Sequence, residues 1–137
     1  MDRICLNNGN KKIEINDSGD YIVIPMGDNS FPERVIKFSK DAENKYKLLV
    51  EKEIELKDSD IEVVSKMRSE IFTSIGSMFD ELFGIGSCKI VFGNIAPSHD
   101  IMLDFMEQIV PLVERYASER QSEIETKYSK RSRRWWI

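Results

Sequence analysis

The sequence predicts an α+β fold, in which an N-terminal β-meander or hairpin is followed by three mainly antiparallel helices. Three observations support this class. Residues 3–25 alternate apolar and polar side chains, residues 31–56 and 60–83 repeat apolar side chains every three or four positions, and helical spacing returns over residues 98–126. At 137 residues the chain has the size of one domain. We expect that domain to span residues 1–126 and residues 127–137 to form a basic aromatic tail.

The strand region consists of three short apolar runs separated by turn residues. The runs are RICL, KKIEI and DYIVIP, with NNGN and NDSGD between them. Asn8-Gly9 supplies the positive φ values that a tight hairpin turn requires, which predicts a hairpin between the first two runs. Asp17-Ser18-Gly19 supplies the next turn. This pattern predicts about three strands within residues 3–25.

The first predicted helix covers residues 31–56. Ser30 can cap it, and Pro32 lies in the first turn, where a missing N–H group costs nothing. Its apolar stripe consists of Phe31, Val35, Phe38, Ala42, Tyr46 and Leu49. Because the opposite face carries charges of both signs, we expect this helix to pack on one side only.

The second predicted helix covers residues 60–83. Ser59 and Glu62 have the spacing of a capping box at its start, and Gly84 follows its last residue, as glycine often does. Its apolar stripe consists of Ile61, Val64, Ile71, Ile75, Met78 and Leu82, widened by Phe72 and Phe79. The run CKIVFG, residues 88–93, is expected to be a short extended segment.

The third predicted helix covers residues 98–126. Ser98 can cap it, and Asp100 suits the positive end of its dipole. Its apolar stripe consists of Ile101, Phe105, Ile109, Leu112, Val113 and Tyr116. Pro111 should kink or split the helix, because it lacks a backbone donor and crowds the carbonyl four residues back. Beyond it we expect a solvated helix that frays into the tail.

The residues capable of chemistry form no recognisable catalytic set. Cys88 could act as a nucleophile only beside a positioned base, and His99 is the one histidine. One histidine and two distant cysteines do not make a usual zinc site. The glycines of residues 84–87 follow a helix, whereas a dinucleotide-binding loop follows a strand. The pair Asp80-Glu81 lies on a predicted polar face. We therefore predict a non-enzymatic protein without cofactor or metal.

Two further features bear on where the protein works. Cys5 and Cys88 lie far apart in the sequence, and the chain opens on a charged Met-Asp-Arg, so we expect reduced cysteines in a cytoplasm. A membrane-spanning helix needs about 18 consecutive apolar residues. The apolar runs here are interrupted by charged residues or glycine every few positions, so no membrane insertion is expected.

The charge of the chain is unevenly distributed. Of 20 basic residues, five follow residue 126 without any acidic residue, which leaves 15 against 24 acidic residues in the first 126, a net charge of −9. The tail KYSKRSRRWW could follow nucleic-acid phosphates and stack on bases, or it could bind an acidic protein groove. The acidic body argues against nucleic acid because it would repel a polyanion.

One stretch of the sequence resembles a known family. The helix ending Phe79-Asp80-Glu81-Leu82-Phe83-Gly84, the Gly86-Ser87 turn, the Val91-Phe92-Gly93 patch and the helix Phe105-Met106-Glu107-Gln108-Ile109-Val110-Pro111 resemble the tail assembly chaperones of phages and prophages of Gram-positive bacteria. The resemblance covers roughly residues 60–120. Its motif is glycines and aromatics at a helix junction, which we expect to form a structural elbow of Phe83, Gly84, Gly86, Phe92 and Gly93.

The resemblance implies a role in the cytoplasm of the bacterial host. Such a protein binds the tape measure protein, or another tail protein, during tail morphogenesis, and homo-oligomers are possible. If the chain works in this way, we expect its partner to contact residues after the elbow and in the tail, namely Ile95, Met102, Phe105, Arg131, Arg133, Arg134, Trp135 and Trp136. The alternative is a nucleic-acid-associated regulator that uses the basic tail, which predicts salt-dependent binding.

Overall fold

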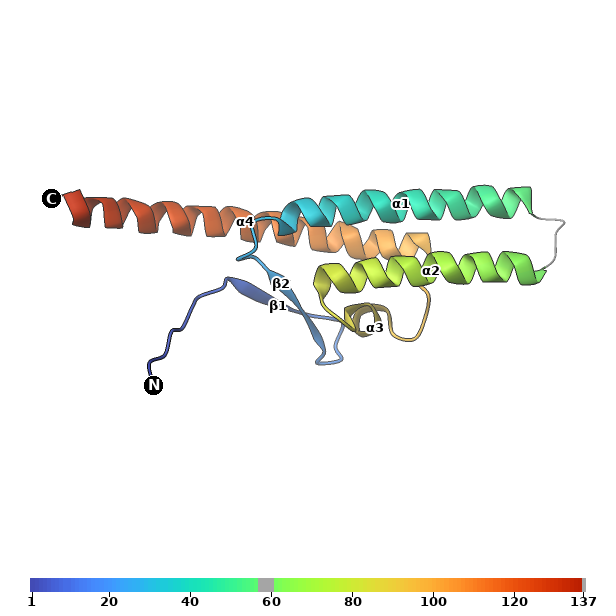
Figure 1. The fold of residues 1–137 in the computed structure, drawn as a ribbon, viewed down its shortest axis with the longest axis horizontal. Helices are drawn as coiled ribbons and strands as arrows, with labels where there is room; N and C mark the ends of the chain where they lie inside the picture. Colours follow the sequence, from blue (N-terminus) through green and yellow to red (C-terminus); the bar gives the residue numbers. More distant parts are fainter. Residues whose placement is uncertain (57–60, 137) are drawn as a thin grey trace.

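The computed structural model describes residues 1–56 and 61–136, with side chains as far as Ser129. The elements follow in the order β1 (Asn10–Glu14), β2 (Tyr21–Pro25), α1 (Phe31–Glu55), α2 (Ile61–Phe83), α3 (Ser87–Phe92) and α4 (His99–Trp136). The strands form an antiparallel hairpin and the helices follow it (Figure 1). The predicted α+β class is therefore confirmed.

The β-hairpin is built from the second and third predicted runs. Its register pairs Asn10 with Pro25 and Glu14 with Tyr21, and the turn is closed by a 2.9 Å hydrogen bond from Ile15 N to Asp20 O. The first run, residues 3–6, is not a strand in the structure. Its apolar side chains find nothing to cover them, since Ile4 is 87% exposed. An N-terminal hairpin is therefore confirmed, but it is closed by the Asp17-Ser18-Gly19 turn. The hairpin predicted at Asn8-Gly9, between the first two runs, and the three-stranded meander are wrong.

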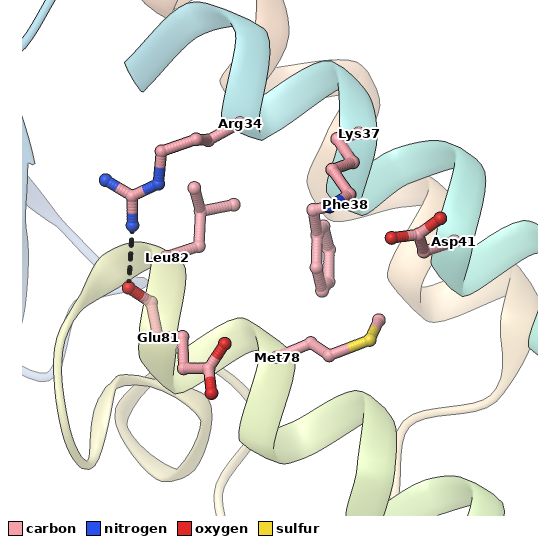
Figure 2. A pocket seen from close by; sticks show the side chains of 7 residues that line it. All are labelled: Arg34, Lys37, Phe38, Asp41, Met78, Glu81 and Leu82. Carbon is pink, nitrogen blue, oxygen red and sulfur yellow. Dashed lines mark hydrogen bonds between the residues drawn. The ribbon is translucent and has the colours of Figure 1, made fainter. Parts of the chain in front are cut away.

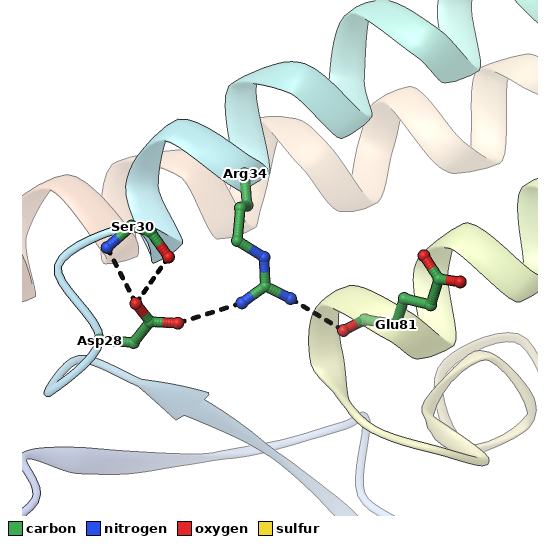
Figure 3. A network of polar contacts seen from close by, with 4 residues as sticks. All are labelled: Asp28, Ser30, Arg34 and Glu81. Atoms are coloured by element: carbon green, nitrogen blue, oxygen red, sulfur yellow. Dashed lines mark hydrogen bonds and ion pairs between the residues drawn. The ribbon is translucent and has the colours of Figure 1, made fainter.

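Helix α1 buries the whole predicted stripe from Phe31 to Leu49. Ser30 is its N-cap residue, but its side chain makes no capping hydrogen bond. The Ser30 hydroxyl instead donates to Asp28 Oδ1 at 2.6 Å, and the Ser30 N–H donates to the same oxygen at 2.9 Å (Figure 3). The Asp28 side chain thus forms an Asx-type turn, which organises the chain just before the helix.

Helix α2 ends at Phe83 as predicted. Gly84 adopts a φ of +111°, and its N–H donates to Asp80 O at 2.8 Å, which closes the last turn. The predicted capping residue Ser59 lies outside the described residues. The buried part of the stripe lies in the second half of the helix, at Ile75, Phe79, Leu82 and Phe83.

The run CKIVFG is helical rather than extended, so that prediction is wrong. Its residues belong to α3, which begins at Ser87 and ends at Phe92. Valine and isoleucine favour strands only where a neighbouring strand is available to pair with them. Here Val91 and Phe92 pack against the core instead, and a side chain from α2 satisfies the first N–H groups of the turn.

Helix α4 continues to Trp136, ten residues beyond the predicted boundary, and it is not split at Pro111. Both Pro111 and Glu107, whose carbonyl loses its helical partner, are exposed, so water can solvate that carbonyl. Residues 112–136 contain no glycine or proline. The basic residues after residue 126 also lie at the negative end of the helix dipole, where positive charge is favourable.

The core is organised around Phe79, whose side chain is completely buried. Its ring lies 5.8 Å from the ring of Phe38 on α1 and 4.7 Å from that of Phe83 on α2. It also lies 5.3 Å from Phe92 on α3 and 5.2 Å from Phe105 on α4. Tilted and edge-to-face aromatic pairs at these distances are favourable beyond their burial. One ring therefore contacts all four helices of the described chain.

We predict that Phe79→Ala lowers the free energy of unfolding by about 3–5 kcal/mol, because it removes a large buried ring and leaves a cavity. Denaturation by urea, followed by circular dichroism, measures the change. Ile85→Ala is the control, since Ile85 is fully exposed and its truncation should change stability by less than about 0.5 kcal/mol. A loss below about 1 kcal/mol for Phe79→Ala would contradict the central role of this ring.

Candidate functional site

The five residues of the predicted elbow lie together at the junction of α2, α3 and α4. Phe83 and Phe92 both contact Phe79 and Phe105 through their rings. Gly84 and Gly86 have φ values of +111° and +85°, which L side chains rarely adopt, so glycine is needed for the tight reversal between α2 and α3. Gly93 is the C-cap residue that follows Phe92, the last residue of α3. The elbow is therefore a structural joint.

Asp80 holds the elbow together, a role that the sequence did not reveal. Its Oδ1 accepts hydrogen bonds from the Cys88 N–H at 2.9 Å and the Ser87 hydroxyl at 3.3 Å, and its Oδ2 accepts one from the Gly86 N–H at 3.2 Å. This carboxylate thus caps α3 from the neighbouring helix. Sequence rules for helix capping consider residues within the first turn of the helix. Asp80 lies six to eight positions before the groups that it caps.

Cys88 is half-buried and packs against Gly76 of α2, where its Sγ lies 3.7 Å from the position that a Cβ would occupy. Burial raises the pKa of the Cys88 thiol, and the negative charge of Asp80 raises it further. A nucleophilic cysteine needs the opposite, a pKa lowered by positive surroundings. The structure therefore gives Cys88 the environment of a packing residue.

Tyr46 fixes the point at which α4 begins. Its hydroxyl donates to Pro97 O at 2.8 Å, and its ring stacks on His99 with 4.8 Å between ring centroids. Burial raises the pKa of Tyr46 to about 12. The ring of Phe72 on α2 lies 6.3 Å from the ring of Tyr46 on α1, so these two residues mark the level at which α4 begins. Both α1 and α2 continue beyond this level.

We call that continuation the arm, consisting of residues 47–55 of α1 and 61–71 of α2. At 1.5 Å per residue it extends roughly 15 Å beyond Tyr46 and Phe72, and Figure 1 shows both helices running past the first turn of α4. An ion pair between Arg68 Nε and Glu53 Oε1, 3.0 Å apart, joins its two helices. No third helix of the described chain covers the arm.

The apolar stripe of α2 continues onto the arm but loses its cover there. Ile75 is 1% exposed, Ile71 and Val64 are half-buried, and Ile61 is 80% exposed. An open groove lies along the same helix. We call it the arm groove. It is lined by Ser65, Arg68, Ser69, Phe72 and Thr73 of α2 and by Asn94, Ile95 and Ala96 of the loop after α3. Ile95, a predicted partner-binding residue, is 56% exposed at its edge.

The other predicted partner-binding residues are not gathered at this groove. Met102 is 2% exposed and belongs to the core, so it is not part of a free surface. Phe105 is half-buried in the aromatic cluster and lines a second groove between the hairpin turn, α3 and α4. The other predicted partner-binding residues lie in the last turns of α4, where side chains are outside the described part of the chain: Arg131, Arg133, Arg134, Trp135 and Trp136.

A small pocket between α1 and α2 has a charged rim over an apolar floor. Figure 2 shows its lining side chains, which are Arg34, Lys37, Phe38, Asp41, Met78, Glu81 and Leu82. The guanidinium of Arg34 donates to Glu81 O at 2.9 Å and forms an ion pair with Asp28 at 3.1 Å (Figure 3). Arg34 therefore satisfies a carbonyl at the end of α2 and joins α2 to the turn before α1.

The carboxylate of Asp28 is held in its charged form by this network. Hydrogen bonds from Ser30 lower the pKa of Asp28 most, and the nearby Arg34 lowers it further. Of the charged side chains that line this pocket, Arg34 is engaged with Asp28 and with the Glu81 carbonyl. Among residues 1–56 and 61–129, no group of three or more His, Cys, Asp or Glu side chains could hold a metal ion. No helix in the described part of the chain is long and apolar enough to cross a membrane.

Comparison with known proteins gives one match. The model of a family of unknown function, DUF6673, matches residues 19–135. The match begins in the hairpin turn and spans β2 and the helices almost to the end of α4. No curated protein and no solved structure matches the chain.

We predict that Asp80→Ala lowers the free energy of unfolding by about 1–2 kcal/mol, as loss of a helix cap does. Amide hydrogen exchange should accelerate most at Gly86 and Cys88, whose N–H groups lose their acceptor. Glu81→Ala is the matched control, because the Glu81 side chain is exposed and only its backbone carbonyl takes part in the network. Equal effects of the two variants would show that Asp80 does not cap α3.

We predict that Tyr46→Phe lowers the free energy of unfolding by about 1–2 kcal/mol at neutral pH, since Pro97 O loses its donor in a buried setting. The phenol ionises near pH 10 in the unfolded chain but only near pH 12 in the folded protein. Its contribution is therefore complete below pH 10 and is lost as the pH rises towards 12. Denaturant titrations at pH 7, 10 and 11.5 should show the difference between wild type and variant shrinking, whereas a constant difference would contradict this account.

Proposed function

Since the chain belongs to the DUF6673 family, whose function is unknown, we propose a function from its own sequence and surfaces. We propose that it is a non-enzymatic tail assembly chaperone of a phage or prophage, which binds the tape measure protein in the host cytoplasm during tail morphogenesis. The resemblance of residues 79–93 and 105–111 to that family supports this identity. The exposed apolar stripe of the arm supports the mode of binding.

The single observation that carries the proposal is the change in exposure along α2. The same helical stripe is 1% exposed at Ile75 and 80% exposed at Ile61. The apolar pattern thus extends beyond the segment that α4 covers. An amphipathic helix from a partner could lie on this part of the stripe, taking the place that α4 leaves open. Such a helix would be anchored by apolar residues at i, i+3 and i+4.

The polar rim of the arm groove suits a protein partner better than a nucleic acid. The arm carries five acidic and four basic residues, so it offers no excess of positive charge to a phosphate backbone. Ser65, Ser69 and Asn94 offer hydroxyl and amide groups next to the apolar Phe72 and Ile95. A long helical chain with a narrow apolar stripe, as a tape measure protein is expected to be, fits this combination.

Co-expression tests the proposal. The full chain and the tape measure protein of the same phage genome should co-purify, and the partner should be insoluble when expressed alone. We predict that Ile61→Glu and Ile95→Glu each weaken the complex at least about tenfold, because burial of an apolar side chain contributes about 1.5–3 kcal/mol. Ile36→Glu is the matched control, since Ile36 is 54% exposed on α1 outside the arm and Ile95 is 56% exposed.

Circular dichroism of each variant must match that of the wild type, so that weaker binding is not a folding defect. Unchanged binding of both variants would exclude the arm and its groove as the docking site. If the partner stays insoluble and the chain instead retains nucleic acid until the salt concentration is raised, the alternative function is favoured. Truncation after Thr126 should then abolish retention, because it removes the five basic residues of the tail.

A further inference from the structure

Strand β1 has one paired edge and one free edge. It pairs with β2 alone, and no third strand of residues 1–56 or 61–136 lies beside it. In an antiparallel ladder, successive residues direct their N–H and C=O groups alternately towards the partner strand and away from it. The hydrogen bond from Ile15 N to Asp20 O shows that Ile15 faces the partner strand. Lys12 and Glu14 therefore direct their backbone groups away from β2, to the free edge.

A groove runs along this free edge, between the hairpin, α3 and α4. Its hairpin wall consists of the consecutive residues 13–16, and none of its lining residues belongs to β2. Side chains of consecutive strand residues point to opposite faces of a sheet. A groove that is lined by all four residues therefore lies at the edge of β1 and not over one face of the hairpin. We call it the edge groove.

The edge groove has an apolar interior and a polar rim. Four side chains of α3 and α4 line it and are buried or half-buried: Val91, Phe92, Phe105 and Ile109. Glu14, Asp104 and Gln108 also line it and are exposed. An extended segment in this groove can pair its backbone with Lys12 and Glu14, while every second side chain enters the apolar interior.

The position of α4 beside β1 decides which kind of segment fits. Lys11 Nζ lies 5.6 Å from the centre of the Tyr116 ring, and the Arg120 guanidinium lies against Gly9, so α4 follows the free edge of β1. The β1 strand of a second copy carries its own α4 along the same edge and therefore cannot enter the edge groove. The segment that fits is extended and has no helix packed along its pairing edge.

We propose that an extended segment of another protein adds to β1 as a third, antiparallel strand, between β1 and α4. Antiparallel pairing is the more stable direction per residue. Opposite charges directly across a ladder are favourable and like charges are unfavourable. The segment therefore carries an acidic residue opposite Lys12, a basic residue opposite Glu14 and apolar residues at the alternate positions. The edge groove shares no lining residue with the arm groove, so the inference does not depend on the proposed tail function.

A synthetic peptide with this pattern tests the proposal on the full chain. The blocked heptapeptide TVKVEVT, paired antiparallel, places its lysine opposite Glu14, its glutamate opposite Lys12 and its valines on the side of the apolar interior. An amide NMR titration should show saturable binding with a Kd below about 1 mM, and hydrogen exchange should slow at the N–H groups of Lys12 and Glu14. N-methylation of the peptide at both its lysine and its glutamate should weaken binding at least about tenfold, since two hydrogen bonds to β1 are lost. N-methylation at the central valine, whose N–H points away from β1, should have the smaller effect.

The direction of pairing is tested with the peptide TVEVKVT, which has the same composition but the opposite order of charges. It should bind at least about threefold more weakly, because both cross-strand charge pairs become repulsive. The double variant Lys12→Glu with Glu14→Lys should reverse this preference. Ile101→Glu should weaken binding of TVKVEVT because it places a charge in the edge groove. Leu103→Glu is the matched control, since Leu103 is 43% exposed on the same helix outside the groove and Ile101 is 41% exposed.

Four results would overturn the proposal. They are no binding of TVKVEVT at about 1 mM, equal effects of the two kinds of N-methylation, equal effects of Ile101→Glu and Leu103→Glu, and binding that Ile61→Glu abolishes, which would place the peptide on the arm. The double variant Ile4→Ser with Leu6→Ser should leave the affinity for the peptide unchanged. A tenfold gain would also overturn the proposal, because the chain's own N-terminal residues would then be the segment that occupies the edge. None of these results alters the co-expression test of the arm.

Discussion

The contact of the Phe79 ring with aromatic rings from α1, α2, α3 and α4 is the constraint on which the rest of the structure depends. A short chain with two strands and long helices has few ways to bury a continuous core. Concentrating the rings at the junction of the helices fixes their crossing point. The hairpin adds Ile22 and Ile24 to the same core. The elbow glycines and Asp80 then allow α3 to fold back, so that the Phe92 ring contacts Phe79.

A core concentrated at one crossing leaves the outer parts of long helices without cover. The arm lies on one side of the crossing and the last part of α4, residues 121–136, on the other (Figure 1). In both, a buried apolar stripe continues into solvent with unchanged helical spacing. Exposed apolar side chains are ordinary when scattered. Here they are aligned with the core, at Ile61 on α2 and at Tyr128 on α4, so the apolar stripe of each helix extends beyond the segment that the core covers.

The sequence predicted what local patterns determine and missed what distant contacts determine. The α1 stripe from Phe31 to Leu49 was predicted in full, because helical spacing alone defines a buried face. The helical state of α3 was missed, since it depends on capping by Asp80 from another helix. Ile95 and Met102 were predicted to share a surface, but one is 56% exposed and the other 2%. Which apolar residues are covered depends on how the helices lie against one another along their lengths, and no local pattern specifies that.

The start of α4 is set by the contact between Tyr46 and Pro97, so this hydrogen bond also sets the length of the arm. If α4 began about three turns earlier, it would reach the level of Val64 and Ile61. The buried phenol stacked on His99 makes that boundary specific, because the hydroxyl has one acceptor at 2.8 Å and little access to water. A residue outside the arm groove thus determines how much apolar surface the molecule offers. Binding capacity in this fold follows from where a helix starts as much as from which side chains it carries.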